Sequence, residues 1–232
     1  MSRNRLQHRL GPGLHVACFT LLIFIGFNVR AGETIDRIVA TVNGYIILQS
    51  DWDEEVRYEA FINSRALDHI SAEDRKAALD RLIDQELLHE QAQPLNLWHP
   101  SQEEITNAVE QIRGQLSDGR IDRLWHAALT SYGLREADLR RRVIVQLELM
   151  HLVDIRLRPA IHVESKNVES YYSQQFLPAL RRSGSKPVPL ATVSARVQEL
   201  LTQQQINERL LSWIQQLRAA SNIRADFRGH GE

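Results

Sequence analysis

Residues 35–51 read IDRIVATVNGYIILQSD, and this stretch decides the start of the fold. Ile35 to Val42 is rich in β-branched residues, which favour strands. Asn43-Gly44 is the strongest short hairpin signal because both turn positions need positive φ. Tyr45 to Gln49 therefore predicts the returning strand, and Ser50-Asp51 predicts the cap of a first helix.

The rest of the chain is predicted to be mostly helical. Apolar residues recur at helical spacing over residues 51–63, 71–93, 101–117, 136–157, 166–176 and 193–220, with a shorter helix through Leu124 and Leu129. Residues 136–157 are apolar on most sides, so we expect this helix to be the most buried one. The helix over 193–220 has two apolar stripes that point in different directions, which predicts two packing partners. Residues 222–227 predict a last strand, so the expected fold class is mainly α with a small β-hairpin joined by a C-terminal strand.

Residues 1–31 have the pattern of a secretory signal peptide. Three arginines precede an apolar run from Val16 to Val29, which is shorter than the roughly 20 residues of a membrane-spanning helix. The small side chain of Ala31 fits cleavage directly after it; the alternative is an uncleaved anchor. Cleavage removes four of the 28 basic residues, leaving 24 against 29 acids, a net charge of −5. We expect an exported protein with no stable membrane insertion after cleavage.

The composition excludes several classes of protein. With 43% apolar and 25% charged residues, the chain can bury a core and is not a disordered tail. The near-neutral charge argues against a nucleic-acid binder, and arginine runs such as Arg140–Arg142 are read as solvated faces. The lone cysteine, Cys18, lies in the expected signal peptide and excludes a disulfide or thiolate zinc site in the mature chain. No nucleotide-binding or nucleophile motif is present, so we expect no catalytic residue and no cofactor.

One pattern favours a metal site. Glu86–His89 and Glu148–His151 are two Glu-x-x-His pairs on separate helices, the spacing used by carboxylate-bridged di-iron bundles. Helical-wheel arithmetic turns both histidines inward. Further carboxylates are available from Glu54, Glu55 or Glu59 and from Glu104 or Glu110. The alternative is that each histidine is a partly buried imidazole paired with a carboxylate, which needs no metal. The sequence also does not single out the further ligands that a complete metal site requires.

The four tryptophans fall on separate elements. Trp125 and Trp213 lie in apolar stripes and are predicted to be core residues. Trp52 follows a capping Asp51, and Trp98 lies in a loop between helices, so both are candidates for exposed rings. Exposed aromatic side chains suit the binding of extended polypeptide, which makes Trp52 and Trp98 the candidate peptide-binding residues. Half-buried loop aromatics are the alternative.

The sequence resembles the SurA-type periplasmic chaperones. The resemblance starts with the hairpin and helix cap of residues 35–51 and continues through Arg81–Leu88, Gly133–Arg135 and Val163–Tyr172. Leu210–Arg218 and the strand after it resemble the returning helix and strand that complete the N-terminal module in that family. The resemblance therefore implies a helical SurA N-terminal-like chaperone module.

Members of that family commonly insert parvulin-type prolyl isomerase domains, which are missing here. Only 16 residues separate Phe176 from Val193, and a domain needs at least about 50. The expected organisation is a signal peptide (1–31), a helical chaperone module (32–176), a linker replacing the isomerase domain (177–191) and a C-terminal helix and strand that complete the module (192–232).

The resemblance implies a non-enzymatic function. The expected protein is an ATP-independent periplasmic holdase for unfolded polypeptides, in particular outer-membrane protein precursors. A periplasmic assembly scaffold and the carboxylate–histidine metal bundle are the alternatives.

Overall fold

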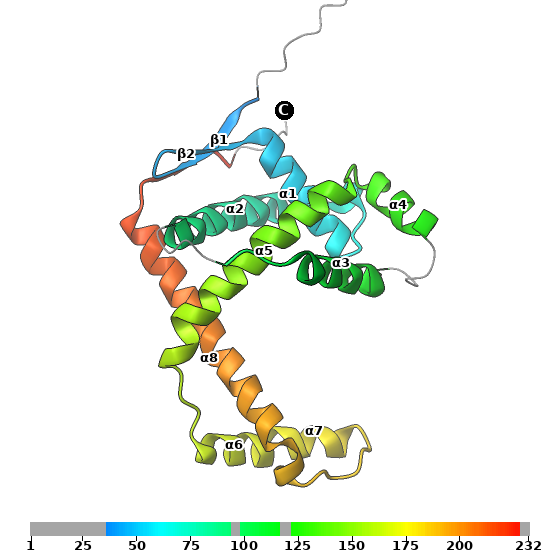
Figure 1. The fold of residues 1–232 in the computed structure, drawn as a ribbon, viewed down its shortest axis with the longest axis vertical. Helices are drawn as coiled ribbons and strands as arrows, with labels where there is room; N and C mark the ends of the chain where they lie inside the picture. Colours follow the sequence, from blue (N-terminus) through cyan, green and yellow to red (C-terminus); the bar gives the residue numbers. More distant parts are fainter. Residues whose placement is uncertain (1–35, 94–97, 117–121, 228–232) are drawn as a thin grey trace, which may run out of the picture. The chain divides into compact units, whose positions relative to one another are not determined.

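The computed structural model describes residues 36–93, 98–116 and 122–227. The expected signal peptide lies outside this part of the chain. The strands are β1 (Ile38–Val42), β2 (Tyr45–Leu48) and β3 (Ile223–Ala225). The helices are α1 (Gln49–Ile62), α2 (Ala72–Ala92), α3 (Gln102–Leu116), α4 (Asp122–Ser131), α5 (Glu136–Leu157), α6 (Ser165–Tyr171), α7 (Leu177–Arg182) and α8 (Leu190–Ala220), with 3₁₀ turns at Leu67–His69 and Arg158–Ala160 and a π-helical turn at Tyr172–Phe176 (Figure 1).

The three strands form one antiparallel sheet in the order β2-β1-β3. Asn43 and Gly44 take φ values of 50° and 98°, as the tight hairpin turn requires. Val42 pairs with Ile223. The turn is also tied to the last strand, because the Asn43 N–H donates to the Asn222 carbonyl at 3.0 Å and the Asn222 N–H donates to Asn43 Oδ1 at 2.9 Å. The predicted return of the C-terminal strand to the hairpin is confirmed.

The start of α2 agrees with the predicted capping residue, whereas the start of α1 differs from the prediction. At α2, Ser71 Oγ accepts from the Asp74 N–H at 3.1 Å while the Asp74 carboxylate accepts from the Ser71 N–H at 3.0 Å. Helix α1 begins at Gln49, earlier than the cap predicted at Ser50-Asp51. Asp51 instead lies inside the first turn, where its carboxylate accepts from the Leu48 N–H at 3.0 Å.

Two apolar clusters hold the sheet and the first five helices together. The first joins the sheet to α1 and α2 and includes Val39, Val42, Trp52, Leu79 and Ile83. The second joins the end of α1 to α3, α4 and α5; in it the Phe61 ring lies 5.7 Å from that of Trp125. Trp125 is buried, as predicted. Helix α1 thus connects the two clusters, with Trp52 in the first and Phe61 in the second.

Helix α8 packs with two separate apolar clusters, as its two stripes predict, and it also packs against α5 (Figure 1). Near its start, Val197 packs with Val163 and Val168 of the α6 region. Near its end, Leu217 packs against the sheet cluster, and Arg218 Nη1 lies 3.1 Å from Asp80 of α2.

The segment expected to be a linker, 177–191, contains helix α7 up to Arg182, and α8 starts at Leu190. One expectation needs correction. Helix α5 is not the most buried helix: four of its 22 residues are buried, against six of the 14 in α1, and Met150 of α5 is 59% exposed. The exposed side of α5 faces a cavity.

Candidate functional site

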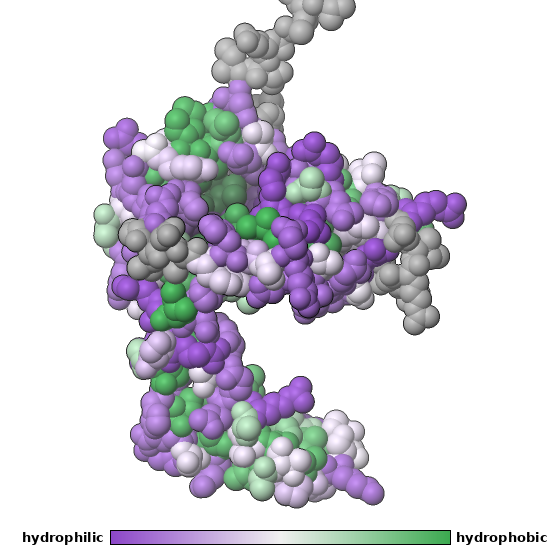
Figure 2. All heavy atoms as spheres, viewed as in Figure 1, coloured by the Kyte–Doolittle hydropathy of each residue, from purple (hydrophilic) through white to green (hydrophobic). Residues whose placement is uncertain are grey.

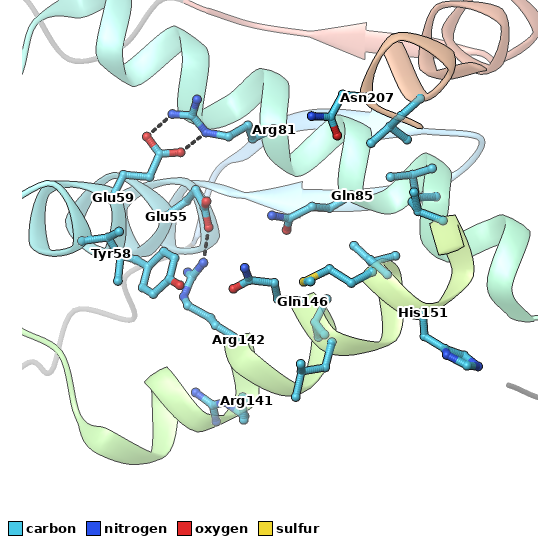
Figure 3. Close-up of a pocket in the computed structure, with 18 of the residues that line it drawn as sticks. Glu55, Tyr58, Glu59, Arg81, Gln85, Arg141, Arg142, Gln146, His151 and Asn207 are labelled. Carbon is cyan, nitrogen blue, oxygen red and sulfur yellow. Dashed lines mark hydrogen bonds and ion pairs between the residues drawn. The ribbon is translucent and has the colours of Figure 1, made fainter. Parts of the chain in front are cut away.

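Four helices, α1, α2, α5 and α8, line a cavity of about 1330 Å³, here called the four-helix cavity. This volume exceeds the roughly 300–1,000 Å³ of ordinary small-molecule sites. Its walls include Glu55, Tyr58 and Glu59 of α1, Arg81 and Gln85 of α2, Arg142, Gln146 and Met150 of α5, and Asn207 and Leu210 of α8 (Figure 3). A cavity of this size has room for a segment of polypeptide.

Helix α5 supplies an apolar wall to the four-helix cavity. Val145, Leu149, Met150 and Val153 line it, and among them Val145 and Met150 are exposed. Apolar side chains that remain exposed inside a concave surface favour binding of an apolar ligand. In the sequence, this wall is indicated only by the breadth of the apolar surface of α5. That surface is wider than the single apolar stripe of a helix that packs on one side.

An ion-pair cluster joins α1 to α5 at one end of the cavity. Glu55 is only 2% exposed, and Arg142 Nη1 donates to its carboxylate. Arg142 Nη2 also donates to Glu54 at 3.2 Å, and its guanidinium lies 4.9 Å from the Tyr58 ring centroid (Figure 3). Burial raises the pKa of Glu55, although the neighbouring Arg142 acts in the opposite direction.

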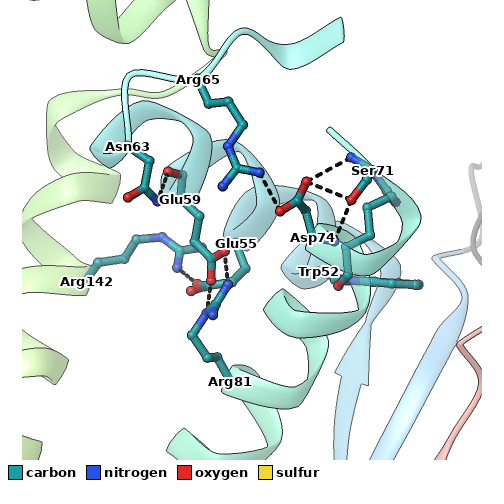
Figure 4. A network of polar contacts seen from close by, with 10 residues as sticks. Trp52, Glu55, Glu59, Asn63, Arg65, Ser71, Asp74, Arg81 and Arg142 are labelled. Carbon is teal, nitrogen blue, oxygen red and sulfur yellow. Dashed lines mark hydrogen bonds and ion pairs between the residues drawn. The ribbon is translucent and has the colours of Figure 1, made fainter. Parts of the chain in front are cut away.

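Two further carboxylates of the cavity wall, Glu59 of α1 and Asp74 of α2, are also paired. Arg81 binds Glu59 through two nitrogens, and Arg65 binds Asp74 (Figure 4). The Arg65 hydrogen bond, with those from Ser71, lowers the pKa of Asp74 to about 2. Because acids and arginines neutralise each other around the cavity, it has little net charge to attract a charged ligand.

Trp98 lies at the rim of the four-helix cavity, packed against α5. Its ring is 38% exposed and its centroid lies 4.7 Å from that of His151. The next residue, His99, contacts Glu148 of α5 through Nδ1 at 2.7 Å. The exposure expected of Trp98 is confirmed, and its peptide-binding role stays a prediction.

The exposure expected of Trp52 is wrong. Its ring is 1% exposed within the sheet cluster, and Nε1 donates to the Arg75 carbonyl at 2.6 Å. Although Trp52 lies in the first turn of α1, the sheet and α2 cover it, so it presents no surface to a peptide. Trp213, expected in the core, is only half-buried and lies beneath the Arg156 guanidinium at 5.2 Å.

The two Glu-x-x-His pairs do not come together. His89 is exposed, contrary to the inward orientation expected, and His151 packs against Trp98. Within the described ranges no group of three histidine, cysteine or acidic side chains is placed to hold a metal ion.

Other apolar side chains gather over β1 and β2 (Figure 2), where Ile38, Tyr45 and Ile46 are exposed. This hairpin surface is separate from the residues that line the four-helix cavity.

Comparison with known proteins places the chain in a family. The family model for the SurA-like N-terminal domain matches residues 8–153. The chain belongs to the SurA-like N-terminal domain family. The match ends inside α5, so it includes α1 and α2 but not α8. Membership supports a role as a periplasmic chaperone and agrees with the helical SurA N-terminal-like fold.

Among solved structures, a similar chain comes from work describing PEB4 and Cj1289 of Campylobacter jejuni as two structurally related SurA-like chaperones. The alignment has 13% identity and a TM-score of 0.48, and covers 83% of this chain and 99% of the other. No curated protein sequence matches the chain significantly. In the part of this SurA-like domain that the structure describes, no helix has the length and apolarity needed to span a bilayer.

Proposed function

We propose that this SurA-like domain is an ATP-independent periplasmic holdase that binds unfolded polypeptides, in particular outer-membrane protein precursors, in the four-helix cavity. The observation that carries the proposal is the exposed apolar wall of α5 inside a cavity large enough for a chain segment. Residues 1–31 are proposed as the signal peptide that directs export. Trp98, at the rim, is proposed as one aromatic contact to the client.

The proposed binding needs no catalytic group. Burial of apolar surface contributes about 25 cal/mol per Å², but association and ordering of the client offset much of it. We therefore expect affinities of roughly micromolar, weak enough for release without nucleotide. The non-helical connection at residues 183–189 leaves no room for an inserted isomerase domain, which supports a non-enzymatic function.

Met150→Glu is expected to weaken the holdase activity. A carboxylate on the apolar wall opposes burial of client side chains, so about fivefold more protein should be needed to suppress aggregation. The measurement is light scattering of a urea-unfolded outer-membrane barrel protein after dilution, with increasing amounts of the chaperone.

Ile155→Glu is the matched control, because Ile155 lies on the same helix, is 42% exposed and does not line the cavity. This variant should match the wild type. If the wild-type protein fails to suppress aggregation at a few-fold excess, the holdase proposal is wrong and the scaffold alternative is favoured. If both variants lose activity equally, the cavity is not the binding site.

A further inference from the structure

Two side-chain amides lie on facing walls of the four-helix cavity. Gln85 extends from α2 and Gln146 from α5, and both point into the space between these helices (Figure 3). Neither side chain forms a hydrogen bond within residues 36–93, 98–116 and 122–227. The amide pair on α8 differs, because Gln203 Nε2 donates to Asn207 Oδ1 at 3.3 Å.

These two amides differ from the charged groups around them. Glu55, Glu59 and Asp74 are each engaged by an arginine, and an ionised carboxylate can only accept hydrogen bonds. An unpaired glutamine offers two N–H donors and one carbonyl acceptor at the same position. Gln85 and Gln146 therefore present free donors and acceptors beside the apolar wall of Met150.

The chemistry that complements such a surface is a peptide main chain. An extended segment carries one N–H and one C=O on nearly every residue, and these groups need partners when apolar burial removes water. A glutamine amide can pair with both the N–H and the C=O of one residue, because these two groups lie on the same side of an extended chain. Carboxylates and guanidinium groups can each pair with only one of them.

We propose that Gln85 and Gln146 bind the main chain of an extended client, while the α5 wall buries its apolar side chains. The cavity then selects unfolded polypeptide by its exposed backbone and tolerates many sequences, because main-chain hydrogen bonds do not depend on side-chain identity. This inference rests on the proposed holdase function and specifies how the same site recognises its client.

The test compares two fluorescent probes by anisotropy with the purified full-length protein. One probe is a short unstructured peptide rich in tyrosine, valine and serine, and the other has the same sequence with N-methyl groups on alternate residues. Wild type should bind the unmodified peptide about tenfold more tightly, because methylation removes main-chain donors. In the double variant Gln85→Leu, Gln146→Leu the two affinities should become equal.

The ratio of the two affinities is the readout, so a general gain of apolar affinity from leucine does not affect the result. Gln216→Leu on α8, an exposed glutamine outside the cavity, should keep the wild-type ratio. Equal binding of both peptides by wild type, or an unchanged ratio in the double variant with native circular dichroism, would overturn this inference alone. Absence of binding to either peptide would overturn the holdase proposal as well.

Discussion

Replacement of Trp52 by alanine is expected to lower the free energy of unfolding by about 3–5 kcal/mol, the usual cost of truncating a large buried aromatic side chain. The ring fills the space between the sheet and α2, and its Nε1 donates to the Arg75 carbonyl. Loss of the ring leaves a cavity and removes the donor to that carbonyl. Urea unfolding followed by circular dichroism measures the change.

Trp98→Ala is the matched control for this prediction. Its ring is partly exposed at the cavity rim, so its removal should cost about 1 kcal/mol or less. The opposite order, with Trp98→Ala more destabilising than Trp52→Ala, would contradict the placement of Trp52 in the core.

Arg142→Leu is expected to destabilise the protein by about 3–5 kcal/mol at neutral pH, because it leaves a buried carboxylate without its cation. The carboxylate is that of Glu55 on α1, and Arg142 is its partner from α5. Chemical denaturation at several pH values measures the effect. The double variant Glu55→Leu, Arg142→Leu should recover much of the loss, since it removes both charges from the interior.

The Arg142→Leu defect should depend on pH with a defined sign. Burial raises the pKa of Glu55, and loss of Arg142 removes the contribution that lowers it. A carboxyl whose folded pKa lies above its unfolded value binds its proton more tightly in the folded state, so stability falls as pH rises above the unfolded value. The defect should therefore be smaller near pH 4 than at pH 8. An equal defect at both values would show that lost packing of Arg142, and not the unpaired charge, causes it.

The parts of the fold that depend on local chemistry could be predicted from the sequence. Asn43-Gly44 predicts its turn because few residues tolerate positive φ, and Ser71 predicts a helix start because its hydroxyl satisfies a free backbone donor. The two stripes of α8 predicted two packing partners because their directions differ along one rigid helix.

The candidate site was harder to predict from the sequence, because its composition depends on which helices pack together in the fold. Trp52 follows a polar cap, and nothing local indicates that the sheet and α2 close over it. The apolar breadth of α5 suggested burial, whereas part of that surface lines the cavity. Gln85 and Gln146 carry no motif, and only the packing of α2 opposite α5 places them on the same cavity.

Site-specific photo-crosslinking tests the central claim most directly, namely that the four-helix cavity holds unfolded polypeptide. A photoreactive amino acid is placed at Trp98 or Val145, which line the cavity, or at Leu211, which is exposed outside it. Each protein is then irradiated with an unfolded outer-membrane barrel protein. We predict strong crosslinks from Trp98 and Val145 and weak ones from Leu211; equal crosslinking at all three positions, or crosslinks from Leu211 alone, would contradict the account.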